Sequence, residues 1–166
     1  MGGRGPHVVH NLKKLIQFGP GGVYISNPRQ KAPVMQTLVL YLVTALVFLG
    51  LDAVMLKAVM RPLFDTHIGS LFAAELRLAP AALFYLFYVA GILWFVSLPA
   101  LRAGTPLTAL LAGAFLGALA YGTYEFTNYA TLRDWHWHMV AVDVTWGAVL
   151  TAVSAWSGVM AARMVG

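Results

Sequence analysis

Four long stretches without a charged residue constrain the fold of this chain more than any other feature of its sequence. They contain 20, 24, 22 and 19 residues in chain order. A helix needs about 20 apolar residues to cross a hydrocarbon core roughly 30 Å thick. The pattern therefore predicts an all-α integral membrane protein, a four-helix transmembrane bundle. The predicted spans are about 35–60, 79–100, 105–128 and 139–163.

The composition excludes several other classes of protein. Hydrophobic residues make up 60% of the chain and charged residues 10%, whereas soluble domains are about a quarter charged. β-Barrel strands would be about half as long as these stretches and would alternate in polarity. The absence of cysteine excludes disulfides and thiol catalysis. The net charge of +5 is thinly spread, which argues against nucleic-acid binding.

Prolines and mixed polar segments predict where the spans end. Pro62 disfavours helix at Arg61, so we expect the first span to end there. We expect Pro99 and the segment 103–106 to form a tight turn between spans two and three. The third connection, at 131–138, is rich in tryptophan and histidine, as is typical of a membrane–water interface.

The distribution of Lys and Arg predicts the orientation. Seven of them lie on the side of the two termini and four on the other side, which favours cytoplasmic termini. The seven are Arg4, Lys13, Lys14, Arg29, Lys31, Arg102 and Arg163. The four are Lys57, Arg61, Arg77 and Arg133.

Residues 1–34 differ from the rest and predict a basic arm rich in Gly and Pro. Apolar residues at helical spacing predict a short amphipathic helix over 7–18, suited to an anionic membrane surface or to a protein partner. The candidate docking residues are Val8, Leu12, Lys13, Lys14, Leu15, Ile16 and Phe18.

Three acids fall inside the predicted spans. An ionised carboxylate at the centre of a membrane helix costs roughly 2.5–3.5 kcal/mol on insertion scales, so such groups face protein, water or a partner charge. Asp52, Glu125 and Asp143 all lie toward the non-cytoplasmic face of the predicted bundle, and the short third connection brings Glu125 and Asp143 near each other. The candidate polar cluster comprises Asp52, Lys57, Arg61, Tyr121, Glu125, Asn128, Arg133, Asp143 and Trp146.

Two interpretations of this cluster remain open. In the first, the acids pair with Lys57, Arg61 or Arg133, or accept hydrogen bonds from Tyr and Asn, and fix the helix register. In the second, they bind a proton, a cation or a small polar ligand, and paired carboxyls share a proton. A metal site has less support, because the two-residue spacing of His136 and His138 suits no common zinc motif. We predict no metal.

Small residues predict close helix packing in spans three and four. Gly113 and Gly117 form a GxxxG motif, and Ser154 and Gly158 repeat the spacing. These residues indicate packing of the two spans on each other, or contact with another subunit. Span two is aromatic nearly all round, which suits lipid, a protein interface, or a pigment or quinone held with neighbouring subunits.

Several longer motifs resemble a family of small bacterial integral membrane proteins classified as domain of unknown function 2177. The resemblance covers about residues 35–159 and is carried by LGLDAVML at 49–56, RPLF at 61–64, LAPAALFY at 78–85, YEFTN at 124–128, ATLRDW at 130–135 and VDVTWG at 142–147. Met55 stands where the family typically has Trp, and Glu125 where it has Asp. The resemblance implies four spans and a bacterial inner membrane, cytoplasmic or intracytoplasmic. It supplies no activity.

Three hypotheses of function follow. The first is a non-enzymatic accessory subunit of a larger membrane complex of the respiratory or photosynthetic kind. Such a subunit would have a docking arm and lipid contacts, and it would bind no cofactor directly. The second is a proton- or ion-coupled carrier of a small solute that uses Asp52, Glu125 and Asp143. The third is a membrane enzyme acting on a lipid or isoprenoid with Asp143 or His136 as base, although no catalytic motif or residue is evident.

Overall fold

The computed structural model describes residues 16–19, 22–25, 34–73, 75 and 77–166. The chain divides into two compact units, Met1–Ala32 and Pro33–Gly166.

The first unit contains a two-stranded antiparallel hairpin of β1 (Ile16–Gly19) and β2 (Gly22–Ile25). Gly19 at the end of β1 pairs with Gly22 at the start of β2. The helix predicted over 7–18 is therefore wrong at Ile16 and Phe18, which belong to a strand. The other docking candidates, Val8, Leu12, Lys13, Lys14 and Leu15, lie outside the described residues.

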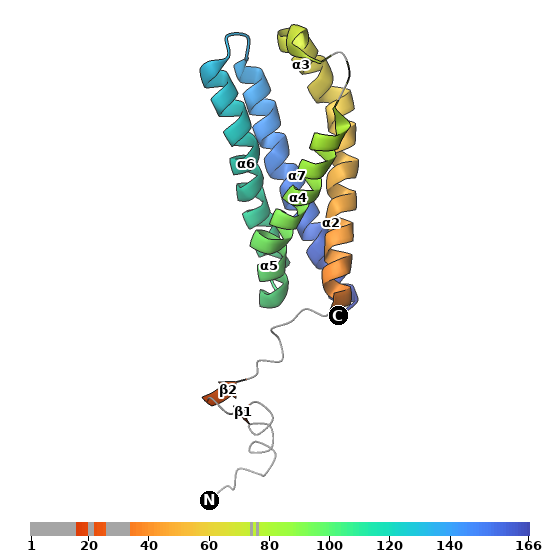
Figure 1. Cartoon of the computed structure of the whole chain (residues 1–166), viewed down its shortest axis with the longest axis vertical. Helices are drawn as coiled ribbons and strands as arrows, with labels where there is room; N and C mark the ends of the chain where they lie inside the picture. The colour runs from red at the N-terminus through yellow and green to blue at the C-terminus, as the bar shows by residue number, and fades with distance from the viewer. Residues whose placement is uncertain (1–15, 20–21, 26–33, 74, 76) are drawn as a thin grey trace, which may run out of the picture. The chain divides into compact units, whose positions relative to one another are not determined.

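The second unit contains four helical runs that are long and apolar enough to cross a membrane. Figure 1 shows them packed side by side along one axis. The first run consists of α2 (Val34–Met55), η1 (Leu56–Met60), α3 (Arg61–Ile68) and η2 (Gly69–Leu71). The second consists of α4 (Leu78–Ile92), η3 (Leu93–Ser97) and α5 (Leu98–Ala103). The third and fourth are α6 (Pro106–Thr131) and α7 (Trp137–Met164).

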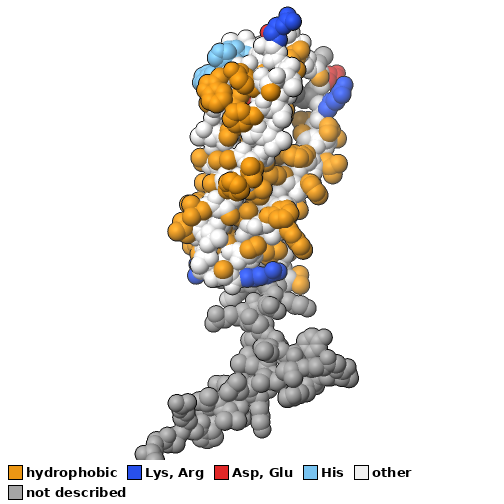
Figure 2. Space-filling view, turned by 90° about the vertical axis from the view of Figure 1, so that its left-hand side faces the viewer, with side chains coloured by type: hydrophobic (Ala, Val, Ile, Leu, Met, Phe, Trp, Pro, Cys, Tyr) orange, Lys and Arg blue, Asp and Glu red, His pale blue; other side chains and the backbone are white. Residues whose placement is uncertain are grey.

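The surface of this unit suits a bilayer. Hydrophobic side chains cover the middle of the face shown in Figure 2, and Lys and Arg side chains lie near its two ends. Large apolar residues of all four runs are exposed, among them Leu46, Phe87, Phe115 and Val149. In water such a surface would aggregate, whereas hydrocarbon solvates it.

Two prolines lie inside helical runs where the sequence predicts a helix end and a turn. The first run continues past Pro62 as α3, and the second continues past Pro99 as α5, so both predicted boundaries are wrong. A proline removes one helical N–H and crowds the carbonyl four residues earlier. In both runs a five-residue π-helical segment ends two residues before the proline, and its wider turn accommodates the ring. The chain turns between spans two and three at Gly104, which has a left-handed φ of 70°.

Helix α7 is the most buried of the four spans and packs on α6 and α2. Close contact with α6 depends on glycine: a Cβ on Gly117 would lie 2.1 Å from the carbonyl oxygen of Gly147, and one on Gly113 would lie 3.0 Å from the Cα of Ala152. The GxxxG motif thus packs within the chain.

The second small-residue motif packs against a different helix. A Cβ on Gly158 would lie 2.2 Å from Oγ1 of Thr44 on α2, and Ser154 is also fully buried. At the end of the bundle where α2 begins and α7 ends, Nε2 of Gln36 donates to the carbonyl oxygen of Ala162 over 3.2 Å. The first and last spans therefore lie side by side and antiparallel.

Candidate functional site

Figure 1 shows α3 and the α6–α7 connection at the same end of the bundle. The three membrane acids lie toward this end, because Asp52 is near the end of α2, Glu125 near the end of α6 and Asp143 near the start of α7. Their side chains are removed from the surface: Asp52 is 3% exposed, Glu125 0% and Asp143 8%. Glu125 is six residues from the end of α6 and Asp143 six from the start of α7. At 1.5 Å per residue both lie about 9 Å inside the helix ends.

Two tryptophan indoles donate hydrogen bonds to these carboxyl groups. Nε1 of Trp146 on α7 donates to Oδ1 of Asp52 on α2 over 3.2 Å, which joins the two helices. Nε1 of Trp135, in the α6–α7 connection, donates to Oε2 of Glu125 over 2.8 Å. An indole N–H can only donate, so the carboxyl oxygen is the acceptor in each bond.

Glu125 and Asp143 bring two carboxyl groups together across the α6–α7 interface. Both side chains are buried, and α6 and α7 pack closely against each other. The second oxygen of Glu125, Oε1, is buried and has no hydrogen-bond partner within the described part of the chain. Two neighbouring carboxyls can hydrogen-bond directly only when one of them carries a proton.

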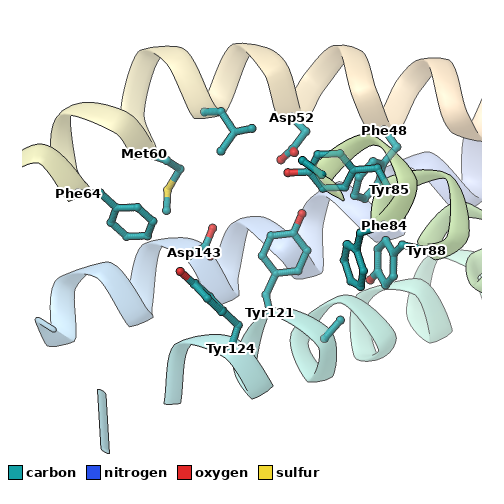
Figure 3. Close-up of a pocket in the computed structure, with 13 residues that line it drawn as sticks. Phe48, Asp52, Met60, Phe64, Phe84, Tyr85, Tyr88, Tyr121, Tyr124 and Asp143 are labelled. Carbon is teal, nitrogen blue, oxygen red and sulfur yellow. The ribbon is translucent and has the colours of Figure 1, made fainter. Parts of the chain in front are cut away.

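A pocket of about 490 Å³ opens beside the acids. Figure 3 shows the labelled residues around it: the hydroxyl groups of Tyr85 and Tyr121 point toward Asp52, and that of Tyr124 points toward Asp143. The lining residues are Phe48, Asp52, Leu56, Met60, Phe64, Ala81, Phe84, Tyr85, Tyr88, Ala120, Tyr121, Tyr124 and Asp143.

The aromatic residues of α4 divide between the pocket and the outer surface. Tyr85 and Tyr88 are half-buried against Phe48, with ring centroids 5.8 and 5.5 Å from its ring. Phe87 is 75% exposed and does not line the pocket. Phe84 lines the pocket and is also 59% exposed, so it stands at the rim.

Aromatic contacts link the lining of the pocket to the α6–α7 connection. The ring of Trp135 lies 5.6 Å from Phe64 and 5.4 Å from Tyr124, both of which line the pocket. Trp135 is itself buried among Ile68, Met139 and Val140. One residue therefore holds the α6–α7 connection against α3 and positions Glu125.

The basic residues of the predicted cluster do not join the acids. Lys57, Arg61 and Arg133 are exposed, and no salt bridge in the described residues links them to a membrane acid. Nε of Arg61 instead lies 3.7 Å from Oδ2 of the exposed Asp65. The expectation of pairing between these acids and bases is therefore wrong: the basic side chains are exposed, whereas the acids are buried.

The remaining members of the predicted cluster divide between two places. Tyr121 lines the pocket, and Trp146 bonds Asp52 from behind it. Asn128 is half-buried and does not line the pocket. Lys57 and Arg61 line a second pocket of about 410 Å³ on the other side of Leu56, Met60 and Phe64.

The sequence pattern missed Trp135, Tyr85 and Tyr88 as site residues. Trp135 stands in a segment typical of an interface, and only the packing of α3 turns its indole inward. Tyr85 and Tyr88 are three residues apart, so they lie on the same face of a helix. The sequence does not show which part of the bundle that face contacts.

Histidines near this end do not form a metal centre. The rings of His67 and His136 stack in parallel with centroids 4.7 Å apart, and Nδ1 of His136 accepts the backbone N–H of His138 at the start of α7. Among the described residues there is no group of three or more His, Asp or Glu side chains able to hold a metal ion.

Comparison with protein families matches residues 37–160 to the family described as "Predicted membrane protein (DUF2177)". The match covers all three membrane acids and the four helical runs except 34–36 and 161–164, and it begins after the hairpin unit. No curated protein and no solved structure matches the chain.

Proposed function

This chain belongs to the family described as "Predicted membrane protein (DUF2177)". We propose that this multi-pass membrane protein is a carrier that exchanges a small solute for protons. The observation that carries the proposal is the pair of buried carboxyl groups, Asp52 and Asp143, that line an aromatic pocket with no basic residue among its lining.

The cost of burying these acids supports an exchange function. A purely structural hydrogen bond to an indole needs only an acceptor, and an amide oxygen would supply one without charge. Burial of three carboxyl groups inside membrane helices is costly, and that cost is explained when their charge is used. Protonation removes the charge when the pocket is empty, and a solute replaces the proton when it is filled.

The Glu125–Asp143 pair suits the proton half of this exchange. Asp143 lines the pocket, whereas Glu125 lies behind it and does not. A proton held between the two carboxyls leaves when a solute occupies the side of Asp143, and it returns when the solute departs. Glu125 then acts as a positioning and proton-storing residue, and Asp143 as a binding residue.

The two π-helical segments suit the movement that a carrier requires. η3 divides the second span into a part that carries Tyr85 and Tyr88 and a part that packs against α6 and α7. π-Helical segments and prolines interrupt regular helical bonding, so bending concentrates there. Bending at η3 would move both tyrosines relative to Asp52 and Asp143.

The test is solute-driven proton movement in vesicles. The full chain is reconstituted with a pH dye inside, and gradients of methyl viologen, methyl glucoside or succinate are imposed in turn, one probe for each charge class. We expect at least one probe to move protons, and Asp52→Asn and Asp143→Asn to abolish the signal. Asp65→Asn is the matched control, because Asp65 is exposed and lies outside the pocket. Absence of proton movement with all three probes, or equal movement in all variants, would refute the proposal.

A second function, that of an accessory subunit in a larger membrane complex, is favoured by one observation. The family match begins at residue 37, so the hairpin unit is an addition to the family core. In this proposal the arm docks on a partner and the exposed aromatic residues of α4 and η3, among them Phe87 and Trp94, contact it. The setting is a bacterial inner membrane with both termini cytoplasmic. Extraction in mild detergent followed by native electrophoresis tests this function. We expect the chain to migrate in a large stoichiometric complex, and we expect deletion of residues 1–31 to release it. Migration of the full chain as a small free species would refute this function.

A further inference from the structure

The charge and shape of the pocket identify the chemical class of its ligand. Every ionisable side chain among the lining residues is an acid or a phenol, and Lys, Arg and His are absent from that set. The positive groups nearest in sequence, Lys57 and Arg61, line the second pocket instead. An anionic ligand would lie beside two carboxyl groups without a compensating positive charge. A neutral ligand would leave the charge of both carboxylates unneutralised in a medium of low dielectric constant.

Aromatic faces make up most of the remaining wall. Seven of the lining residues are Phe or Tyr. The rings of Phe84 and Tyr88 are nearly parallel, with an interplanar angle of 10° and centroids 6.1 Å apart, and Phe48 is tilted against Tyr85 and Tyr88 (Figure 3). Ring faces attract cations by about 0.5–2 kcal/mol each, most strongly where water is excluded. Carboxyl groups beside several ring faces suit an ammonium or phosphonium group better than a small hydrated metal ion.

The rim of the pocket indicates that the ligand has an apolar body. Phe84 is 59% and Tyr124 51% exposed, and both lie within helices that cross the membrane. The pocket therefore opens between helices toward lipid, and its volume of about 490 Å³ lies in the usual range for drug-sized molecules.

We propose that the ligand is an amphipathic organic cation whose positive group lies between Asp52 and Asp143, against Tyr85 and Tyr121, and whose apolar body extends toward Phe84. This inference rests on the carrier function proposed above and names its substrate class. The cation enters from the bilayer, where its apolar part concentrates it, and its charge replaces the proton held at Asp143.

The test is binding of tetraphenylphosphonium to the full chain in detergent, measured by titration calorimetry. Tetraphenylborate is the matched probe, because it has nearly the same shape and the opposite charge. We expect tetraphenylphosphonium to bind and tetraphenylborate not to bind. Asp143→Asn and Asp52→Asn should each weaken binding about tenfold or more, equivalent to about 1.4 kcal/mol per factor of ten.

Two further variants keep the test decisive should an acid variant fail to fold. Phe84→Ala alters only a rim residue and should weaken binding several-fold, as loss of one cation–π contact predicts. Phe87→Ala, on the same helix but outside the pocket, should leave binding unchanged. Equal affinity for both probes, or unchanged affinity in Phe84→Ala and Asp143→Asn, would overturn the inference.

The outcome separates this inference from the carrier function. Calorimetry in buffers of different ionisation enthalpy counts the protons released on binding. Cation binding without proton release would uphold the ligand class and refute proton exchange. Proton movement with methyl glucoside or succinate, together with no binding of tetraphenylphosphonium, would refute the ligand class and uphold the carrier.

Discussion

Replacement of Gly117 by alanine tests the contact that holds the site together. Gly117 lies on α6 where it crosses α7, and a Cβ there would lie 2.1 Å from the carbonyl oxygen of Gly147 and 2.7 Å from Oγ1 of Thr151. Ordinary contacts begin near 3.4 Å, so the helices must separate by about 1 Å. The obstructing atom belongs to the backbone and cannot rotate away.

The expected cost follows from overpacking. Inserting a methyl group into a tightly packed interface costs about 1–3 kcal/mol, and we expect the upper part of that range because helix backbones must move. Glycine to alanine in an open helix position instead stabilises by about 1 kcal/mol through helix propensity. Gly50→Ala supplies that control, since no atom lies within 4 Å of the place that a Cβ would take there.

The assay is unfolding of the full chain in mixed micelles of increasing SDS content, followed by tryptophan fluorescence. Gly117→Ala should unfold at lower SDS than the wild type, and Gly50→Ala at equal or higher SDS. Because α6 and α7 carry Glu125 and Asp143, the first variant should also weaken cation binding. If Gly117→Ala were as stable as Gly50→Ala, the close α6–α7 contact and the reasoning built on it would be wrong.

Three further substitutions probe the hydrogen bonds and the ion pair near the acids. Trp146→Phe removes the donor to Asp52 and should cost about 1–3 kcal/mol, read from the same SDS titration; unchanged stability would show that the 3.2 Å bond contributes nothing. Trp135→Phe leaves buried Glu125 without its indole donor and should lower stability by a similar amount. Adding Glu125→Gln to Trp135→Phe should recover part of the lost stability. No recovery would argue against loss of this hydrogen bond as the cause. Asp65→Asn should change stability by less than about 1 kcal/mol, because its pairing with a basic side chain is exposed; a larger loss would assign the α3 ion pair a structural role.

Carboxyl groups in membrane helices commonly raise the question of which cation neutralises them. In this bundle the described basic side chains lie elsewhere, and indole N–H groups donate hydrogen bonds to two of the three acids, Asp52 and Glu125. An indole satisfies a lone pair without cancelling charge. The hydrogen bonds thus hold the acids in place while their charge stays available to a proton or a ligand. This combination underlies the proposed carrier function and the proposed organic-cation ligand.

The element boundaries show how far local patterns reach. The four spans and the family follow from hydropathy and from the sequence motifs, and the structure and the family match confirm both. The local pattern predicts a helix end at Pro62 and a turn at Pro99, yet both prolines lie inside continuous helices. Proline locally favours the end of a helix, but within the membrane every backbone polar group must keep a hydrogen-bond partner. The helix therefore continues past each proline, and the π-helical segment before the proline makes this possible.

The sequence by itself determined that the chain crosses a membrane four times, because each charge-free stretch has the length that hydrocarbon demands and leaves no alternative with satisfied backbone groups. The positions of the acids along the antiparallel spans also determined which end of the bundle they share. Only the tertiary structure decided that Trp135 and Trp146 bond the acids while Lys57, Arg61 and Arg133 do not, and that Tyr85 and Tyr88 face a pocket. These facts depend on how far each helix is rotated and how closely α6, α7 and α2 approach. Rotation and approach are set by contacts between residues distant in the chain, such as Gly117 with Gly147 and Gly158 with Thr44, which no local pattern records.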